Sequence, residues 1–412
     1  MDYIFEPSKQ LPIAAKVDLC VIGGSCTGVF AAVRAARMGL SVALIEKTNA
    51  LGGTAGNGLV CVWHSLYDTE QKEQVIAGLT YEMTERLAKQ NAIITIDARP
   101  PAFVFNPEEL KIELDALVKE HKIQLFLHTF YTAAFTDGKK VTAVAIENKG
   151  GRSAIAADFF IDASGDGDVA KDLSLPSYVP EHPQPPTACW LLQGDLQSVS
   201  LSSLLQTYGP EFGLEKDWGW GTSLPGTEEI HMRADTHVFD RFCANAGDLT
   251  EAEVAGREQM RRIVRLLNAK GAGEYRLLSA CSHIGIRETY HYKTRYQADW
   301  KALLTGQRYE NAIMNGSYRI DIHLTEERGI TFLYLDGRKE TFYGRNERKD
   351  FSNWREELGL SGPPATYYQV PFDLLVQEQY DNFLAVGRML NADVESFGAL
   401  RVMVNLNQLG EA

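Results

Sequence analysis

One stretch near the start of the chain leaves little freedom in the fold. Residues 17–47 read "VDLCVIGGSCTGVFAAVRAARMGLSVALIEK". The first eight of these residues form an apolar run that ends in glycine, which is typical of a buried parallel strand. The next segment places small and apolar residues on one helical face, and Gly39 is positioned to end that helix. Because residues 41–47 form a second apolar run, the stretch predicts a strand–helix–strand unit.

The glycines of this unit depart at one position from the G-x-G-x-x-G pattern of dinucleotide-binding folds, because Gly23 and Gly28 enclose Ser25. In that pattern the first glycine makes the turn and the last lets helix and strand pack closely. The middle one lets a pyrophosphate approach the helix N-terminus. A serine adds a Cβ atom there, although its hydroxyl can donate to phosphate. Glu46, at the end of the second strand, is placed to accept ribose hydroxyls. The pattern predicts a nucleotide site, and the alternative is a unit that binds none.

Size and charge narrow the class of protein. The chain has 412 residues, so we expect two or more domains. A formal net charge of −13 argues against nucleic acid or an anionic membrane as the main partner. The first residues lack the basic and apolar segments of a secretory signal, and no run reaches the roughly 18 apolar residues that span a bilayer. We therefore expect a cytoplasmic protein.

The cysteines are scattered singly, without a C-x-x-C pair, at positions 20, 26, 61, 189, 243 and 281. This spacing argues against an iron–sulfur cluster or a zinc site, and we expect no metal. It also lacks the close pair that a disulfide reductase needs. The cysteines are interpreted as structural thiols.

The rest of the chain suggests three parts. Residues 107–121 predict an amphipathic helix, and the turns at Asp137-Gly138 and Gly150-Gly151 predict an antiparallel meander that returns through "DFFIDASG". We assign residues 1–170 to the first part of a nucleotide-binding domain and residues 171–381 to a substrate domain. After residue 381 the chain resumes the pattern of strand, glycine and helix. Within the substrate domain a helix is predicted to open with a Thr250–Glu253 capping box. Residues 382–412 are expected to return to the first domain.

Two later segments separate the possible cofactors. "NALGGTAGNG" (49–58) places a glycine pair beyond Glu46, and "IDASGDGDVA" (161–170) ends a strand in small residues and acids. With these, "HIGIRETY" and "VGRMLNADVESFGALRVMVNLNQLGEA", the chain resembles the FAD-dependent oxidoreductase family of the glutathione-reductase-like flavoproteins, whose relatives include fumarate reductase flavoprotein subunits. The resemblance implies an α/β fold: a Rossmann-like FAD-binding domain with a parallel sheet and a β-meander, plus an inserted α+β substrate domain.

The resemblance also implies roles for individual residues around a non-covalently bound FAD. The loop Gly23, Gly24, Ser25, Cys26, Thr27 and Gly28 would cradle the pyrophosphate, and Glu46, followed by Lys47, would hold the adenosine ribose. Gly52, Gly53 and Thr54 would pass near the pyrophosphate and flavin, and the backbone at Tyr131 would contact adenine. Ser164, Gly165 and Asp166 would line the adenosine half, with Gly387 and Arg388 near the ribitol and pyrophosphate. The segment from Gly398 to Arg401 would lie near the isoalloxazine. Ser25 is then a tolerated variant.

Two departures from the family pattern stand out. Relatives have further basic residues after the "RE" pair, whereas this chain has "RETYHYKT". The sequence also stops at "NLNQLGEA", inside the helix expected to point at the pyrophosphate. We expect a truncated chain in which FAD retention is weakened.

Three residues are candidates for catalysis, each with a structural alternative. Arg287 is a candidate cation facing substrate or flavin, or else half of a salt bridge with Glu288. His291, four residues later, is a candidate base or a structural histidine. His64 is a candidate for covalent attachment to flavin, for lining the pocket, or for ordinary packing. His323 is expected to face solvent. Trp218 and Trp220 are expected to form a pocket wall or to anchor a loop.

The leading functional hypothesis is an FAD-dependent oxidoreductase. It would move a hydride between flavin N5 and a small organic substrate, either a polar, sugar-like alcohol or an activated alkene. Use of FAD in non-redox or tRNA-modifying chemistry is the competing enzyme class, and the acidic composition argues against tRNA. The alternative outside enzymes is a flavin-binding electron-transfer or structural subunit that needs a partner protein. Formation of a homo-oligomer is open.

Overall fold

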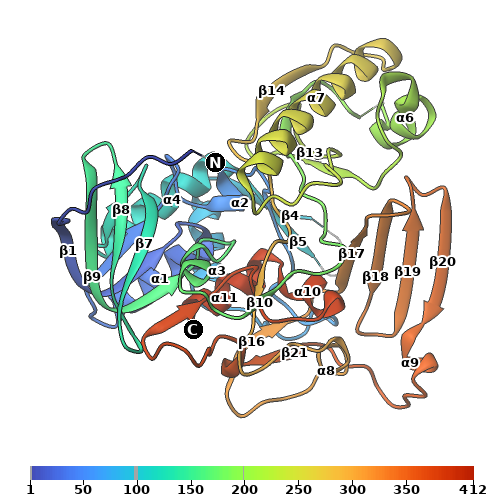
Figure 1. The fold of residues 1–412 in the computed structure, drawn as a ribbon. Coiled ribbons are helices and arrows are strands. Elements are labelled where there is room, and N and C mark those ends of the chain that lie inside the picture. The colour runs from blue at the N-terminus through green and yellow to red at the C-terminus, as the bar shows by residue number, and fades with distance from the viewer. Residues whose placement is uncertain (1, 97–100, 198) are drawn as a thin grey trace.

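A computed structural model describes residues 2–96, 101–197 and 199–412 (Figure 1). Within these residues the largest sheet has seven strands, in the order β6-β2-β1-β9-β8-β7, with β22 also paired to β9. The strands of this sheet are β1 (Ile13–Ile22), β2 (Val42–Ile45), β6 (Gln124–Phe126), β7 (Phe130–Asp137), β8 (Lys140–Asn148), β9 (Gly151–Asp162) and β22 (Phe383–Ala385). The pairings β6-β2, β2-β1, β1-β9 and β9-β22 are parallel. The structure therefore has the predicted α/β, Rossmann-like sheet.

The expected strand–helix–strand unit is confirmed as β1, α1 (Cys26–Arg37) and β2. Apolar side chains of α1 such as Val29 and Phe30 are fully buried, which explains why this face of the helix packs on the sheet. The helix ends where predicted, with Met38 as C-cap and Gly39 at a φ of +93°. A left-handed conformation at this point is easily adopted by glycine.

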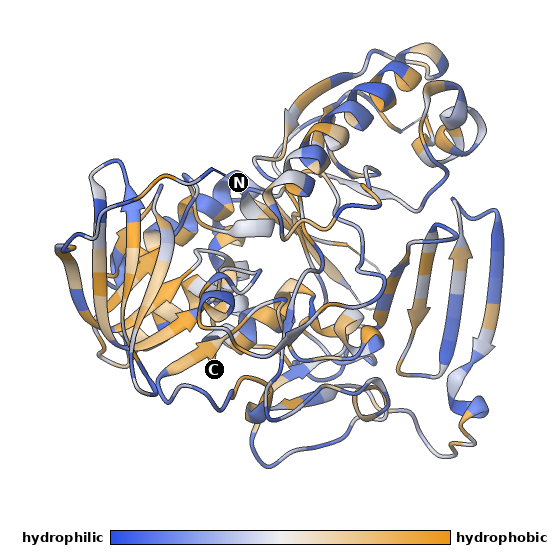
Figure 2. Ribbon diagram, viewed as in Figure 1, coloured by the Kyte–Doolittle hydropathy of each residue, from blue (hydrophilic) through white to orange (hydrophobic). Residues whose placement is uncertain are grey.

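The predicted meander is confirmed as β7, β8 and β9, which pair antiparallel. The long strand β9 serves both parts of the sheet, because its first half pairs with β8 while its second half continues along β1 and β22. Figure 2 shows hydrophobic residues concentrated on the strands of this sheet, in agreement with the buried core around Val21, Leu44 and Phe160. The sheet therefore forms the rigid platform from which the loops at its edge project.

The remaining elements up to residue 172 cover this platform. A helix predicted over residues 107–121 is observed as α4, where Asn106 caps the N-terminus by accepting a hydrogen bond from the backbone N–H of Glu108. The other elements are α2 (Gly53–Gly56), β3 (Val62–Trp63), α3 (Gly78–Lys89), β4 (Ile93–Ile96), β5 (Ala102–Phe105), α4 (Pro107–Glu120) and α5 (Asp168–Asp172). Strands β3, β5 and β4 form a small separate sheet.

The middle of the chain contains several small sheets. One sheet, in the order β12-β13-β11-β14, carries the long helix α7, and another comprises β17 to β20 (Figure 1). The elements before residue 300 are β10 (Ser177–Tyr178), β11 (Trp190–Gln193), α6 (Leu201–Tyr208), a 3-10 helix (Gly209–Phe212), β12 (Trp220–Ser223), β13 (Ile230–Ala234), α7 (Ala246–Lys270), β14 (Arg276–Ala280) and β15 (His291–Tyr292). Those that follow are α8 (Trp300–Leu304), β16 (Ala312–Gly316), β17 (Ile320–Leu324), β18 (Gly329–Leu333), β19 (Arg338–Tyr343), β20 (Arg348–Asn353), α9 (Trp354–Glu357), β21 (Tyr368–Pro371) and a 3-10 helix (Phe372–Leu374).

The start of α7 corrects one sequence prediction. The helix begins at Ala246 rather than at Thr250, and its cap is Asn245, whose side chain accepts from the backbone N–H of Asp248. Glu253, the expected partner in a capping box, instead accepts a hydrogen bond from the backbone N–H of Ile284 at 2.5 Å. The Thr250–Glu253 box was wrong because a better cap lies one turn earlier.

After β22 the chain ends in α10 (Val394–Leu400) and α11 (Met403–Glu411). Helix α11 packs on α1 and α3, and α10 packs on β17. Near the chain end, Glu411 pairs with Arg34 of α1 and accepts the backbone N–H of Leu79 at the start of α3. This segment therefore joins elements from both ends of the sequence, while the domain boundaries at 170 and 381 stay predictions. Among the described residues, no helix combines the length and apolar composition needed to cross a bilayer.

Candidate flavin and substrate site

The carboxyl ends of three neighbouring parallel strands meet at one edge of the main sheet. Ile22 of β1 is in register with Asp162 of β9, and Asp162 is in register with Ala385 of β22. The loops that follow contain Gly23, Gly165 and Gly387, all at positive φ. Ligands of open α/β sheets bind in the crevice outside such strand ends. The sequence segments predicted to bind FAD are thus brought together.

Gly23 and Gly28 occupy positions where a side chain would not fit. A Cβ atom at Gly23 would overlap the backbone of Ala163, and one at Gly28 would overlap the carbonyl oxygen of Gly23. These contacts match the two expected jobs, a tight turn next to β9 and close packing of α1 on β1. Gly23 and Gly28 are therefore required by the same steric constraints as the outer glycines of the G-x-G-x-x-G pattern.

Ser25, at the middle position, is the N-cap residue of α1. No side chain in the described part of the chain caps this helix end, and the Ser25 side chain accepts no capping hydrogen bond. Ser25 also forms an isolated parallel bridge with Gly52, beside Cys26 and Thr27 in the first turn of the helix. The N–H groups of an uncapped helix terminus favour an anion. The loop 23–28 thus keeps the property that a pyrophosphate requires.

Glu46 is buried at the end of β2 and faces this loop. Its Oε2 accepts the backbone N–H of Gly24 at 2.7 Å, and its Oε1 accepts the backbone N–H and the hydroxyl of Thr48, both at 2.7 Å. Lys47, by contrast, is exposed. A carboxylate fixed at this point can accept ribose hydroxyls, which is the role expected for Glu46.

Arg388 lies across the loop that follows β9. Its Nη2 pairs with Asp166 Oδ1 at 2.5 Å, and Asp166 also accepts the Thr289 hydroxyl at 2.8 Å. A Cβ atom at Gly165 would overlap the Arg388 guanidinium, so the glycine makes room for it. The Nε of Arg388 is buried without a partner among the described residues. Such an unpartnered donor suits a phosphate oxygen.

Ser164 and Tyr131 contribute mainly through structure. The Ser164 hydroxyl donates to Asp162 Oδ1, and Asp162 Oδ2 accepts the backbone N–H groups of Val169 and Ala170 at the start of α5. Burial raises the pKa of Asp162 to about 6, although these hydrogen bonds lower it. The Tyr131 hydroxyl donates to Asp172, and the residue lies within β7 in register with Ile146 of β8, so the adenine contact of its backbone stays a prediction. Together with the glycine-lined crevice and the open end of α1, these residues fit FAD.

A second group of residues lies where α10 meets β17. A Cβ atom at Gly398 would lie 2.5 Å from the carbonyl oxygen of Asp321, so that helix and strand touch through their backbones. Arg401 pairs with Asp321, and the hydroxyl of Tyr318 donates to the same carboxylate at 2.9 Å. His64 stacks on Tyr318 with a centroid distance of 4.0 Å. Gly398 to Arg401, expected near the isoalloxazine, and His64, a candidate for covalent attachment, pocket lining or packing, are thus brought together.

His64 is neutral at physiological pH. Burial, together with the charge of Arg319, lowers its pKa to about 3. A neutral imidazole stacked on a tyrosine favours the pocket-lining interpretation. Non-covalent binding of FAD stays the prediction, and covalent attachment to His64 is the alternative to be tested.

Arg287 belongs to a hydrogen-bonded chain that sequence reasoning did not find. Its Nη1 donates to the carbonyl oxygen of Pro185 at 2.6 Å and to the Thr187 hydroxyl, and its Nη2 contacts His237 Nε2 at 3.1 Å. His237 Nδ1 in turn bonds to Asp217. Burial, followed by the charge of Arg401, lowers the pKa of Arg287 to about 10. The alternative of an Arg287–Glu288 salt bridge is wrong, because Glu288 pairs with His291.

His291 is held on both sides. Its Nδ1 contacts the carbonyl oxygen of Leu390 at 2.6 Å, and its Nε2 contacts Glu288 Oε1 at 3.0 Å. The side chain is almost fully buried. Since neither ring nitrogen is left for a substrate, the geometry favours the structural histidine over the base and corrects the catalytic assignment.

His323 was expected to face solvent, and that prediction was wrong. The residue is only 7% exposed, and its ring lies 4.7 Å from that of His237. Alternation along a strand predicts a solvent face only where one side of the sheet is uncovered. Helix α10 and the loop around His237 leave β17 with little exposure. Trp218 packs against Phe332 and Phe342, which favours its role as a loop anchor.

Asp217, Gln184, Thr187, His237 and Asp321 are therefore the residues that the sequence did not reveal. They come from segments far apart in the chain and form no local motif. Asp217 and His237 also line a small surface depression with Gln259, Arg262 and Arg345. No group of three or more His, Cys, Asp or Glu side chains within residues 2–96, 101–197 and 199–412 is arranged to hold a metal ion.

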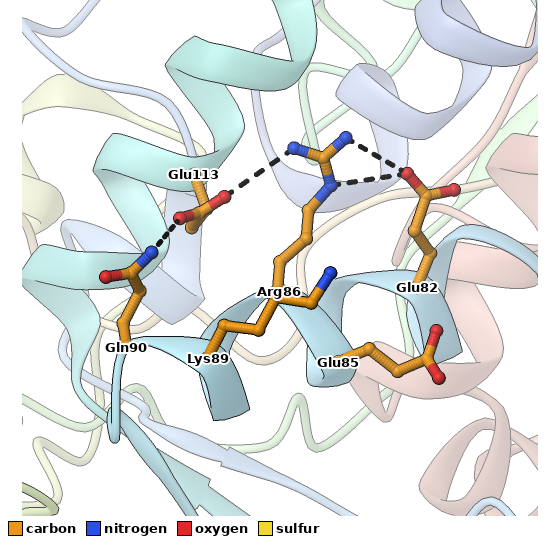
Figure 3. A pocket seen from close by; sticks show the side chains of 6 residues that line it. All are labelled: Glu82, Glu85, Arg86, Lys89, Gln90 and Glu113. Atoms are coloured by element: carbon orange, nitrogen blue, oxygen red, sulfur yellow. Dashed lines mark hydrogen bonds and ion pairs between the residues drawn. The ribbon is translucent and has the colours of Figure 1, made fainter.

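A second surface depression lies far from these groups, between α3 and α4 (Figure 3). Arg86 reaches Glu82 and Glu113 there, and Gln90 donates to Glu113 at 3.3 Å. The remaining lining residues are Glu85 and Lys89. Partly exposed ion pairs of this kind join two helices and contribute little stability. This depression offers no arrangement for catalysis.

Comparison with known proteins supports the cofactor assignment. Residues 18–412 match the model of the family described as FAD dependent oxidoreductase. A mitochondrial dihydrolipoyl dehydrogenase of Schizosaccharomyces pombe is 25% identical over 174 residues, which are 38% of this chain and 30% of that protein. The match thus spans less than a third of the length of this curated relative.

In the described part of the chain, the cysteines are free and buried.

Among solved structures, p-nitrophenol 4-monooxygenase PnpA from Pseudomonas putida is similar with a TM-score of 0.44 and 11% identity, over 69% of this chain and 70% of that one. A geranylgeranyl bacteriochlorophyll reductase-like protein from Thermoplasma acidophilum gives a TM-score of 0.41 and 14% identity, over 68% and 66% of the two chains.

Proposed function

Since the chain belongs to the FAD-dependent oxidoreductase family, with FAD as cofactor, we propose that it moves a hydride between flavin N5 and a small polar organic substrate. The candidates are a sugar-like alcohol, which would be oxidised, and an activated alkene, which would be reduced. When bound, FAD supplies the acceptor or donor of the hydride. The chain itself must bind the substrate, orient it and move the accompanying proton.

One observation carries this proposal. The glycine-lined crevice at the ends of β1, β9 and β22 and the polar group around Arg401 are connected by the segment that runs from β22 through α10. The same short segment thus holds Arg388, which faces the predicted pyrophosphate site, and Arg401, which pairs with Asp321. This order supports the proposal that the reactive end of an extended cofactor lies beside a group of buried ionisable side chains. Such groups are typical of catalytic sites.

The residues around Arg401 can orient a substrate and stabilise developing negative charge. Arg287 and Arg401 are fixed cations, and fixed cations favour an alkoxide or enolate in the transition state. The hydroxyl of Tyr318 donates to the carboxylate of Asp321, which also pairs with Arg401. His64, neutral and stacked on Tyr318, provides an apolar wall that limits access of water.

The alternative is a flavin-binding electron-transfer or structural subunit that works only with a partner protein. Turnover by the purified chain with an artificial electron acceptor would exclude this alternative. The finer kinship to fumarate reductase flavoprotein subunits and a cytoplasmic location stay predictions, and formation of a homo-oligomer stays open.

The test is an anaerobic reaction of the purified flavoprotein. A panel of polar alcohols and sugars is added to the oxidised protein, and activated alkenes are added to the dithionite-reduced protein. We expect one class to change the flavin absorbance, by bleaching in the first case or by reoxidation in the second. If neither class changes the absorbance while a redox partner protein does, the electron-transfer alternative is correct.

A further inference from the structure

Arg287 is an interior cation without a carboxylate of its own. Its contacts are a backbone carbonyl, the hydroxyl of Thr187 and the ring of His237. Among residues 2–96, 101–197 and 199–412, no carboxylate lies within ion-pair distance of Arg287. Charged groups in protein interiors are normally paired, because an unpaired one is strongly disfavoured. The guanidinium therefore lacks the partner that an anion would provide.

The surroundings have the same deficit. Asp321 has Arg401, Arg319 and Arg287 near it, and although burial raises the pKa of Asp321, these three cations hold it below its usual value. Asp217 is the other carboxylate of the group, and it contacts Arg287 only through His237. Burial and the charges of Arg287 and His237 keep the pKa of His323 well below its usual value. Arg401, Arg319 and Arg287 thus share Asp321, and of these three only Arg319 also has Glu340 near it among the described residues.

Two buried polar atoms next to Arg287 have no partner in the described part of the chain. They are Nε2 of Gln184, a residue 2% exposed, and Nδ1 of His323. The amide of Gln184 is oriented, because its Oε1 accepts the backbone N–H of His323 at 3.3 Å. Gln184 directly precedes Pro185, whose carbonyl oxygen accepts from Arg287. His323 lies against His237, which contacts Arg287. Unpartnered buried donors call for a ligand that accepts hydrogen bonds.

We propose that Arg287, Gln184 and His323 form a binding site for a carboxylate of the substrate. The carboxylate would supply the missing charge for Arg287 and accept from Gln184 Nε2, and it would select the His323 tautomer that carries its proton on Nδ1. Asp217 and His237 act as positioning residues, since they fix the Arg287 side chain from behind. This site rests on the proposed function and narrows it, because the alcohol or alkene then belongs to an organic acid.

The test compares pairs of ligands that have nearly the same shape but differ in charge. The purified protein is titrated with acetate and with acetamide, and with lactate and lactamide, while the flavin absorbance and the melting temperature are recorded. We expect the carboxylates to give saturable changes and the amides none. Arg287→Gln should weaken carboxylate binding by about tenfold or more, because a charged hydrogen bond is removed. Arg276→Gln is the matched control, since that arginine is exposed and pairs with the exposed Glu274.

His237→Asn tests the positioning role separately. It should weaken carboxylate binding although Arg287 itself is retained, because the imidazole that fixes the guanidinium is gone. If Arg287→Gln fails to fold, Arg287→Lys replaces it, and the comparison of carboxylate with amide on the wild type stands without any variant.

Three results would overturn the proposal. Amides could bind as tightly as carboxylates, Arg287→Gln could bind acetate as tightly as the wild type, or Arg287→Gln could lose its flavin and leave the anion response of the melting temperature unchanged. The last result would assign Arg287 to the cofactor. A protein that contains no flavin would refute the proposed function alone, because anion binding is then read from the melting temperature.

Discussion

Ser25 and Gly53 fit each other at the entrance of α1. A Cβ atom built on Gly53 would lie 2.8 Å from the Cβ of Ser25, closer than two such atoms can approach. Gly53 also has a φ of +49°. The serine in place of the usual middle glycine is therefore accommodated by a glycine on the opposite segment, which explains how the fingerprint tolerates it.

This relationship predicts the effect of Gly53→Ala. The new methyl group overlaps the side chain of Ser25. In addition, the positive φ at position 53 alone disfavours a side chain by about 1 kcal/mol. We expect lower stability and weaker FAD retention, measured as the flavin-to-protein absorbance ratio after gel filtration. Ser25→Gly, the matched control, should retain FAD as well as the wild type.

The double variant Ser25→Gly/Gly53→Ala separates the two causes. Because the serine Cβ is gone, the 2.8 Å overlap is relieved and the penalty of the positive φ remains, so the double variant should be more stable than Gly53→Ala. Urea unfolding of all four proteins gives the coupling energy. Additive effects would show that the two residues do not interact.

Glu46 is predicted to contribute to FAD affinity through its carboxylate. Glu46→Gln should raise the dissociation constant of FAD by roughly tenfold to a hundredfold, since hydrogen bonds to a charged group contribute about 1.5–3 kcal/mol. Titration of the apoprotein with FAD, followed by flavin fluorescence, measures this. Asp18→Asn is the control, because Asp18 also accepts a backbone N–H, from Ser41, but is only half-buried. Equal losses in both variants would contradict a ribose contact.

Acid should weaken the fold through His64. Burial lowers its pKa to about 3, so at pH values between about 3 and the ordinary value of 6.5 the unfolded chain binds a proton that the folded chain does not. Stability should therefore rise with pH across this window. His64→Phe keeps an aromatic ring against Tyr318 and should flatten the dependence. Urea unfolding of the apoprotein at several pH values tests this, and an unchanged slope would exclude His64 as the cause.

Glu411 is predicted to stabilise the contact between α11, α1 and α3. Glu411→Gln weakens both its pairing with Arg34 and its acceptance of the Leu79 N–H, and we expect a loss of about 1–2 kcal/mol in the free energy of unfolding. Arg34→Met removes only the partly exposed ion pair and should cost less. A larger loss for Arg34→Met would mean that the cap of α3 does not matter.

The nucleotide-binding half was largely predictable from local patterns. Val21 and Ile22 before Gly23, and the spacing to Gly39 and Glu46, specify strand, turn, helix and strand within one short stretch. Each of these preferences acts between close neighbours in the sequence. The meander was predictable for the same reason, because its turns carry glycine at Gly138 and Gly151.

The group around Arg287 could not be predicted in this way. Arg287, Asp217 and Asp321 come from three separate segments, and only the tertiary arrangement makes them neighbours. The error at His323 has the same origin, because its burial depends on α10 and on the loop of His237. His291 shows the converse. Its sequence neighbourhood suggested a base, whereas its Nδ1 contacts the carbonyl oxygen of Leu390, which is distant in the sequence.

The most direct test is the visible absorption spectrum of the purified protein, recorded before and after acid precipitation. The arrangement at Gly23, Glu46 and Arg388 predicts a flavin band that moves into the supernatant and is identified there as FAD. A band that remained with the pellet would instead indicate covalent attachment and point to His64. A protein that neither carries FAD nor binds it on addition would contradict the assignment of this crevice as the cofactor site.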